Sequence, residues 1–217
     1  MTRVIASLGC GPQEALLRLS ARTFTPYAER HGYALDLSTT SPDASRPAPW
    51  GKIVILRRLV QEHELVVWID ADAMIVDGRL DIGDELAADR LMALATHRIG
   101  STAMPNTGVW VLRGGDEAVA LLDRIWEQDD LVDHRWWENS AVCRLLGYDL
   151  DPVHLHHPTA LLTERTQDLA PGWNSVHGAR APHARISHYP GYAVRTRRAL
   201  MARDLARVQA RRLLGRW

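Results

Sequence analysis

The chain has 217 residues, enough for one domain with a sizeable hydrophobic core. Its 26 basic side chains (Lys and Arg) balance its 26 acidic ones, so the formal net charge is zero and no overall positive field favours a nucleic-acid partner. No apolar run is long enough to form an integral membrane segment.

The N-terminal residues and the two cysteines indicate where the chain resides. Met1 leads directly into a short apolar stretch at Val4, without the pattern of a signal peptide. Cys10 and Cys143 lie far apart in the sequence and show no metal-ligand spacing. We therefore expect both thiols to be free and the chain to be cytoplasmic.

The first half of the chain alternates strand and helix patterns. Apolar runs and turn signals predict strands over Arg3–Leu8, Tyr33–Ser38, Leu65–Ile69, Leu91–Thr96 and Asn106–Arg113, with helices over Gln13–Arg30 and Trp50–His63. Such alternation predicts βαβ units and an α/β fold, with a mixed, mostly parallel central sheet flanked by helices.

The second half is more helical and less regular. Helices are predicted from Asp116 to Glu127, from Trp136 to Gly147, and from Tyr192 to Trp217. No internal repeat and no low-complexity tract divides the chain, so residues 1–217 are predicted to form a single domain.

The run Leu65–Ile69 carries the strongest chemical signal. Five consecutive apolar residues predict a strand that is buried on both faces, and Asp70 and Asp72 follow it at once. Ligands bind at the carboxyl ends of strands in open α/β sheets, and paired carboxylates suit a hard divalent cation. We predict a metal site at Asp70 and Asp72; the alternative is a plain strand-to-loop cap.

Two further patterns are assigned no chemistry. Asp149-Leu150-Asp151 runs into Pro152, which indicates a turn or strand end with solvated acids. His154 and His156 would share one face of a strand and resemble half a zinc site. Because the sequence shows no clear third ligand, they are interpreted as structural or surface histidines.

Read together, several short motifs carry a family resemblance. They are Tyr27 with His31-Gly32-Tyr33, then Trp50-Gly51-Lys52-Ile53, Trp68-Ile69-Asp70-Ala71-Asp72-Ala73, Asn106-Thr107-Gly108-Val109-Trp110, Trp137-Glu138-Asn139, Trp173-Asn174-Ser175 and His188-Tyr189-Pro190-Gly191. In this order they resemble the galactosyl/xylosyl/mannosyl transferase family of plants and fungi. The similarity covers roughly residues 27–191.

The resemblance implies a GT-A-like (Rossmann-like) fold, a UDP- or GDP-sugar donor, Mn²⁺ (or Mg²⁺) and transfer with retention of anomeric configuration. It makes His188 the third metal ligand beside Asp70 and Asp72, with Asp70 also on the donor side; a packed core histidine is the alternative. It further implies that residues about 1–113 bind the nucleotide sugar and residues about 114–217 complete the metal and acceptor sites.

The remaining donor-side candidates each keep an ordinary alternative. Lys52 lies in the first turn of a helix, where a cation opposes the helix dipole, so an anionic ligand explains it better than stability does, with a solvated lysine as the alternative. Gly191 would let the backbone approach a diphosphate, and Arg195 and Arg197 are phosphate contacts or a solvated helix start. Asn106 would bind sugar hydroxyls or form an Asx turn after the preceding proline.

Glu138 and Asn139 are the catalytic candidates. They occupy the first turn of a helix where the family places a carboxylate and an amide, although a Glu there would also satisfy the helix dipole. The family more often has Asp and Gln, so which of the two faces the anomeric carbon stays open. Trp50, Trp137 and Trp173 adjoin these motifs and either stack on a sugar or belong to the core.

The last predicted helix has an apolar stripe of Met201, Leu205 and Val208 and a row of Arg203, Arg207 and Arg211. Such a row is interpreted as a solvated face, with peripheral contact to an anionic membrane as the alternative. Plant and fungal relatives carry an N-terminal membrane anchor that this sequence lacks, which is why we expect a bacterial, cytoplasmic protein.

The sequence thus favours a metal-dependent glycosyltransferase that moves a sugar from a nucleotide-sugar donor to a small-molecule, glycan or peptide acceptor. A metal-dependent nucleotidyltransferase or phosphohydrolase would also use two acids on a buried strand, but it would need further acids for a second metal. A third alternative is a nucleotide-sugar-binding module without turnover.

Overall fold

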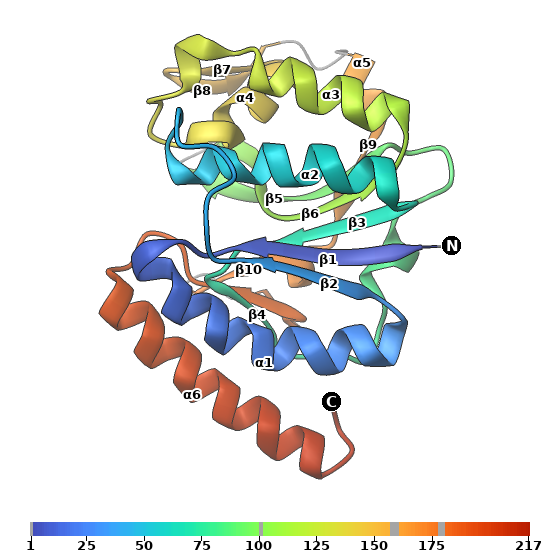
Figure 1. Cartoon of the computed structure of the whole chain (residues 1–217), viewed down its shortest axis with the longest axis vertical. Helices are drawn as coiled ribbons and strands as arrows, with labels where there is room; N and C mark the ends of the chain where they lie inside the picture. The colour runs from blue at the N-terminus through green and yellow to red at the C-terminus, as the bar shows by residue number, and fades with distance from the viewer. Residues whose placement is uncertain (1, 100–101, 157–160, 178–180) are drawn as a thin grey trace.

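The computed structural model describes residues 2–99, 102–156, 161–177 and 181–217. A six-stranded mixed sheet with the order β2-β1-β3-β6-β5-β9 lies at its centre (Figure 1). Its strands are β1 (Arg3–Leu8), β2 (Ala34–Ser38), β3 (Leu65–Ile69), β5 (Met92–Ile99), β6 (Thr102–Arg113) and β9 (Thr166–Leu169). Strand β6 runs antiparallel to both β3 and β5, and the other pairs are parallel.

Two smaller β elements flank this sheet. Strands β4 (Ala73–Ile75), β10 (Ser175–Val176) and β11 (Ile186–His188) form a three-stranded sheet in the order β10-β11-β4. Strands β7 (Tyr148–Leu150) and β8 (Val153–Leu155) form an antiparallel hairpin. These short strands were not predicted, because two or three residues are too few to show a periodicity.

Helices cover both faces of the large sheet. They are α1 (Glu14–His31), α2 (Gly51–Glu62), α3 (Asp116–Trp126), α4 (Trp137–Leu145), α5 (Leu161–Glu164) and α6 (Val194–Leu213). Figure 1 shows α2 and α3 on one side of the sheet and α1 on the other, with α6 beyond α1. The predicted α/β fold with a mixed, helix-flanked sheet is confirmed.

Strand β3 contributes side chains to both clusters of the hydrophobic core. All five of its side chains are buried. Leu65, Val67 and Ile69 pack into the cluster on the α1 side, whereas Val66 and Trp68 pack into the cluster on the α2 side. Because successive side chains of a strand point to opposite faces, an unbroken apolar run is what this position requires.

Strand β6 begins at Thr102, earlier than the predicted start at Asn106. The predicted strand starts directly after Pro105, a residue that cannot donate to a strand ladder. In the structure β6 pairs with β3 only from Val109 onward, while Pro105 faces Thr96 of β5. The missing N–H therefore costs no ladder bond here, and the strand continues through the proline.

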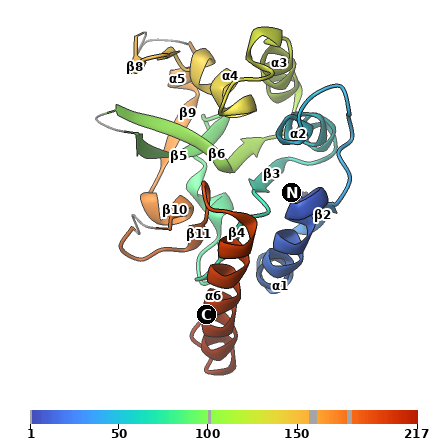
Figure 2. The same ribbon diagram turned by 90° about the vertical axis from the view of Figure 1, so that its left-hand side faces the viewer.

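The C-terminal helix has the predicted amphipathic pattern. Met201, Leu205 and Val208 are buried in the cluster that also contains α1 residues, and Arg207 pairs with Asp204. Figure 2 shows α6 beside α1, on the same side of the large sheet. Within the described ranges, no helix combines the length and the hydropathy that a bilayer-crossing segment needs.

The two cysteines should differ sharply in reactivity. Both are unpaired, but Cys143 is buried, and burial raises the pKa of its thiol to about 12, whereas Cys10 is half-buried. Because the thiolate is the reactive form, a disulfide-exchange reagent should label one thiol in the native protein and two after unfolding. The absorbance of the released thiolate measures the labelling. Labelling of neither thiol in the native protein, or of both thiols at equal rates, would contradict this assignment.

Candidate metal centre and adjoining cavity

A cavity of about 1130 Å³ opens where β3 and β6 adjoin the small sheet. The side chains of Asp70, Asp72, Asn106, Glu138 and His188 all line it. They come from the loop after β3, from β6, from the start of α4 and from the end of β11. The structure thus brings together candidates that lie far apart in the sequence.

Backbone hydrogen bonds bring the acidic loop to His188. The Asp70 N–H donates to the Gly108 carbonyl (2.8 Å), which extends the contact of β3 with β6 by one residue. The Tyr189 N–H donates to the Asp72 carbonyl (3.0 Å), and β11 pairs antiparallel with β4 so that His188 faces Ala73. The residue after the second acid is therefore the ladder partner of the histidine.

The three candidate ligands converge on one point. His188 Nε2 lies 3.3 Å from Asp72 Oδ1 and 3.8 Å from Asp70 Oδ2. One ligand atom from each residue lies within 4.8 Å of the other two. The side chains of His188 and Asp72 are 3% and 12% exposed, so bulk water barely reaches the point between them.

A chain of amide groups sets the tautomer of His188. The Gly108 N–H donates to Asn106 Oδ1 (2.9 Å), so the Asn174 atom that faces the same oxygen at 2.9 Å must be the donor Nδ2. The other Asn174 atom is therefore the acceptor Oδ1, and it lies 2.9 Å from His188 Nδ1. Nδ1 must carry the proton, which leaves the lone pair of a neutral imidazole on Nε2.

This lone pair faces two carboxylates, an arrangement that a cation between them would satisfy. An imidazole whose other nitrogen donates to a fixed oxygen is the usual form of a metal-binding histidine. Two carboxylates and one imidazole form a mixed oxygen and nitrogen donor set that suits Mn²⁺. The residues present therefore fit the divalent metal that the sequence predicts.

Arg197 adds positive charge beside the predicted metal ligands. Its Nη1 lies 2.8 Å from Asp72 Oδ2, and it also lines the cavity. Burial acts to raise the pKa of Asp72, but attraction to the protonated form of His188 and to Arg197 outweighs it, so this pKa lies below its usual value. Arg195 is exposed on the first turn of α6 and is not among the cavity-lining residues, whereas Gly191 is, with a φ of +80°.

Lys52 is buried and faces protein carboxylates. Its Nζ lies 2.6 Å from Glu138 Oε1 and 3.1 Å from Asp70 Oδ1. Burial acts to lower the pKa of Lys52, but the attraction of Asp70 and Glu138 outweighs it and raises the pKa. The anionic partner expected for this lysine is present within the chain itself, and contact with a donor stays a prediction.

Asp70 and Glu138 are held by neighbours as well as by Lys52. Trp68 Nε1 donates to Asp70 Oδ1 (2.6 Å), which leaves Oδ2 turned toward His188. The Thr107 hydroxyl donates to Glu138 Oε1 (3.2 Å). Burial raises the pKa of Glu138, and the Lys52 ammonium offsets this only in part. Neither the Trp68 nor the Thr107 contact was foreseen from the sequence.

The two amide candidates have structural partners. Asn139 Oδ1 accepts from the Thr107 N–H (2.8 Å), and its Nδ2 donates to the Pro105 carbonyl (3.3 Å). Asn106 forms the Asx turn onto Gly108 that was its alternative, and it also orients Asn174. Both side chains still line the cavity, so direct contact of either with a sugar stays a prediction.

The three tryptophan candidates differ in solvent exposure. Trp50 and Trp173 are fully buried core residues. Trp137 is 42% exposed, has a φ of +46°, and lines the cavity next to Glu138. Asn174 belongs to one of the motifs, but the sequence predicted no role for it. Its contact with His188 depends on the pairing of β10 with β11.

Several solved glycosyltransferases share this fold. One involved in the glycosylation of the major capsid of PBCV-1 superposes with a TM-score of 0.71 at 16% identity, covering 92% of this chain and 99% of that one. The galactosyltransferase LgtC gives a TM-score of 0.55 at 10% identity, covering 92% and 95%. The chain therefore has the GT-A fold.

Sequence comparison finds similarity to one glycosyltransferase family. Residues 9–108 match the model of the galactosyl transferase GMA12/MNN10 family. An uncharacterized alpha-1,2-galactosyltransferase of Schizosaccharomyces pombe is 33% identical over 82 residues, which is 35% of this chain and 22% of that protein. An alpha-1,2-galactosyltransferase of the same yeast is 33% identical over 78 residues, 32% and 21%. The matches thus span about a fifth of the length of these relatives, and the resemblance predicted from the motifs is confirmed.

Gly108 offers a test of the metal site that leaves every ligand in place. A Cβ at this position would lie 2.2 Å from His188 Cε1 and 2.8 Å from Asn106 Oδ1. Gly108→Ala should therefore displace the imidazole and weaken Mn²⁺ binding by about 10-fold or more, as changes to groups that orient metal ligands do. Isothermal titration with Mn²⁺ measures this.

Gly215→Ala is the matched control for Gly108→Ala. Gly215 lies after α6, and an added Cβ would meet nothing within 4 Å, although its φ of +67° strains an alanine backbone there. Its Mn²⁺ affinity should equal that of the wild type. Equal Mn²⁺ affinities in all three proteins would contradict the placement of His188 in the metal site.

Proposed function

We propose that this protein is a metal-dependent glycosyltransferase that transfers a hexose from a UDP- or GDP-sugar to an acceptor hydroxyl. The observation that carries the proposal is the convergence of Asp70, Asp72 and the Nε2 lone pair of His188 at the cavity. The GT-A fold and the family match support the reaction class, and the names of the yeast relatives suggest galactose as the sugar.

The donor diphosphate belongs on the His188 side of the cavity. A divalent cation held by Asp70, Asp72 and His188 would neutralise the diphosphate charge as the sugar–phosphate bond breaks. Arg197 stands next to Asp72 with a guanidinium that can pair with phosphate oxygens, and Gly191 leaves room for close backbone approach. We therefore assign to Arg197 the phosphate contact for which the sequence offered both Arg195 and Arg197.

The reacting sugar and the acceptor belong on the Glu138 side. Glu138 is held by Lys52 and Thr107, and its side chain is only 5% exposed, which leaves little room for it to form a covalent sugar. We therefore favour, for a retaining reaction, acceptor attack from the face of the leaving group, with Glu138 positioning donor hydroxyls. Trp137 presents an exposed ring for the acceptor sugar.

A two-metal nucleotidyltransferase or phosphohydrolase is a weaker proposal for this cavity. It would need a second cluster of acids beside the first. In the ranges that the structure covers, the other group of metal-ligand side chains is exposed and does not line the cavity, and Glu138 is paired with Lys52.

The setting of the protein is part of the same proposal. The free thiols of Cys10 and Cys143 support a reducing, cytoplasmic environment. Peripheral contact with an anionic membrane is proposed through α6, where Leu213 and Leu214 are exposed beside the basic residues Arg211 and Arg212.

Asp72→Asn tests the proposed donor site. The substitution removes one carboxylate while keeping its size, so binding of UDP or GDP in the presence of Mn²⁺ should weaken by about 10-fold or more. Binding of a metal-free nucleoside should stay unchanged. Asp123→Asn, which neutralises an exposed acid on α3, is the matched control and should bind like the wild type. Equal nucleotide affinities in both variants would refute the site.

Glu138→Gln separates catalysis from binding. The amide fills the same space but removes the charge that faces Lys52, so Lys52 would turn toward Asp70 and the sugar would lose its alignment. We expect kcat for transfer or donor hydrolysis to fall by about 10²-fold or more. Nucleotide affinity with Mn²⁺ should change little. Unchanged kcat with UDP- and GDP-hexoses that the wild type turns over would remove Glu138 from the catalytic site.

A further inference from the structure

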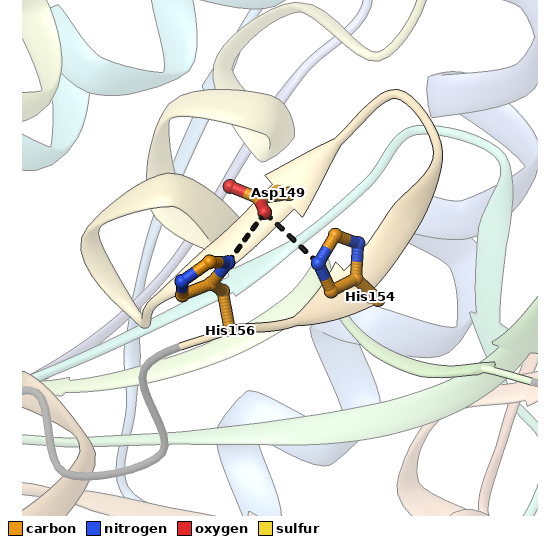
Figure 3. Close-up of side chains that lie close together, drawn as sticks. All are labelled: Asp149, His154 and His156. Atoms are coloured by element: carbon orange, nitrogen blue, oxygen red, sulfur yellow. Dashed lines mark hydrogen bonds and ion pairs between the residues drawn. The ribbon is translucent and has the colours of Figure 1, made fainter.

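The β7–β8 hairpin gathers three side chains that no part of the proposed transferase reaction uses. Asp149 on β7 is the ladder partner of His154 on β8, and His156 follows two residues later on the same face. Figure 3 shows both imidazole rings turned toward the Asp149 carboxylate. His154 Nε2 lies 3.0 Å and His156 Nδ1 2.9 Å from the same oxygen, Asp149 Oδ2.

The backbone around the hairpin holds these groups in place. The His156 N–H donates to the Gly147 carbonyl (2.9 Å), which continues the pairing beyond β8. Tyr148 and Leu150 point to the other side of β7 and pack against the core cluster that contains α4 residues. The polar face of the hairpin is therefore anchored by the apolar one.

The tautomer of His154 points to a cation. Its Nδ1 lies 3.0 Å from the Pro152 carbonyl, which can only accept, so Nδ1 carries a proton. In a neutral ring Nε2 then turns its lone pair toward a carboxylate oxygen only 3.0 Å away. Two acceptors at this distance require a proton or a metal ion between them. An Nδ1–H that donates to a backbone carbonyl is also the typical second hydrogen bond of a metal-ligating histidine.

We propose that Asp149, His154 and His156 form a second metal site, which binds Zn²⁺ or a Zn²⁺-like transition ion. Two imidazoles and one carboxylate favour Zn²⁺ over Mn²⁺, because the affinity of nitrogen ligands rises along the divalent series toward Zn²⁺ and Cu²⁺. This donor set is softer than the two carboxylates and one imidazole of the cavity site. The two sites should therefore select different ions.

The dimensions suit such an ion. Metal–ligand bonds of about 2.0–2.1 Å at a tetrahedral angle separate neighbouring ligand atoms by about 3.3 Å. The two N···O distances of 2.9 and 3.0 Å need to open only slightly, and all three ligand atoms lie within 4.8 Å of one another. Each of the three side chains is about half exposed, so water can take the remaining coordination position and no buried path is needed.

The hairpin site is separate from the cavity. None of its three residues lines the cavity, and Figure 1 shows β7 and β8 beside α4 at the end of the molecule opposite α6. A bound ion would tie His156 to β7, next to the end of α4. We assign it a stabilising role for this part of the fold, with no role in sugar transfer.

Zinc titration of the full chain tests the proposal. In an Asp72→Asn/His188→Ala protein, which lacks the cavity site, isothermal titration should still find one Zn²⁺ per chain. Adding His154→Asn or Asp149→Asn should weaken that binding by about 10-fold or more, since an amide is a poor zinc ligand. His183→Asn, at an exposed histidine whose φ of +55° asparagine tolerates, is the matched control and should keep the Zn²⁺ affinity.

The outcomes distinguish this site from the proposed function. Loss of Zn²⁺ binding in the Asp72→Asn/His188→Ala protein, or binding that His154→Asn leaves unchanged, would overturn the hairpin site alone. Failure of the cavity site would instead appear as Mn²⁺ binding that the Asp72→Asn/His188→Ala substitutions leave unchanged, while one Zn²⁺ sensitive to His154→Asn still binds. Should the variants fail to fold, imidazole nitrogen NMR of the wild type decides, because the resonances of His154 and His156 should shift saturably with Zn²⁺ and those of His183 should not.

Discussion

The proton on His188 Nδ1 is the constraint on which the candidate active site depends. It is fixed by a chain of hydrogen bonds that begins at the backbone N–H of Gly108 and passes through the side-chain amides of Asn106 and Asn174. Each amide can satisfy its neighbours in only one orientation, because the first link is a backbone donor. The consequence is a lone pair aimed at Asp70 and Asp72, and the absence of a side chain at Gly108 is what lets the imidazole sit there.

Charge balance in the cavity follows from the same geometry. Asp70, Asp72 and Glu138 face two cations, Lys52 and Arg197, so with all three acids ionised the site carries one net negative charge. A divalent cation would reverse that sign, which matches the need to attract a diphosphate. Lys52 is the only lysine of the chain, and its burial between Glu138 and Asp70 keeps the two acids from repelling each other across the cavity.

The sequence predicted those parts of the site that depend on local pattern. The apolar run of β3 and the acids that follow it are a local signal, and the family motifs supplied His188, which no local pattern could. Whether Arg195 or Arg197 reaches the cavity depends on where α6 begins, and a helix that starts at Val194 turns Arg195 to solvent. The roles of Thr107, Asn174 and Asp149 depend on contacts across strands, whose register is not written in any single segment.

The two candidate metal clusters share one hydrogen-bond arrangement but differ in burial. In both, an oxygen fixes Nδ1–H of a histidine so that Nε2 faces a carboxylate, through Asn174 in the cavity and through the Pro152 carbonyl on the hairpin. At the exposed hairpin, water can solvate an imidazolium–carboxylate pair, so the fold tolerates the cluster with or without an ion. In the cavity, the Asp70 and Asp72 carboxylates have limited access to water and depend on positive charge nearby. Lys52 and Arg197 supply it, but each contacts the carboxylate oxygen that faces away from His188. The gap that faces His188 is therefore where the fold would gain most from a bound cation, and its burial sets the cavity cluster apart from the exposed hairpin cluster.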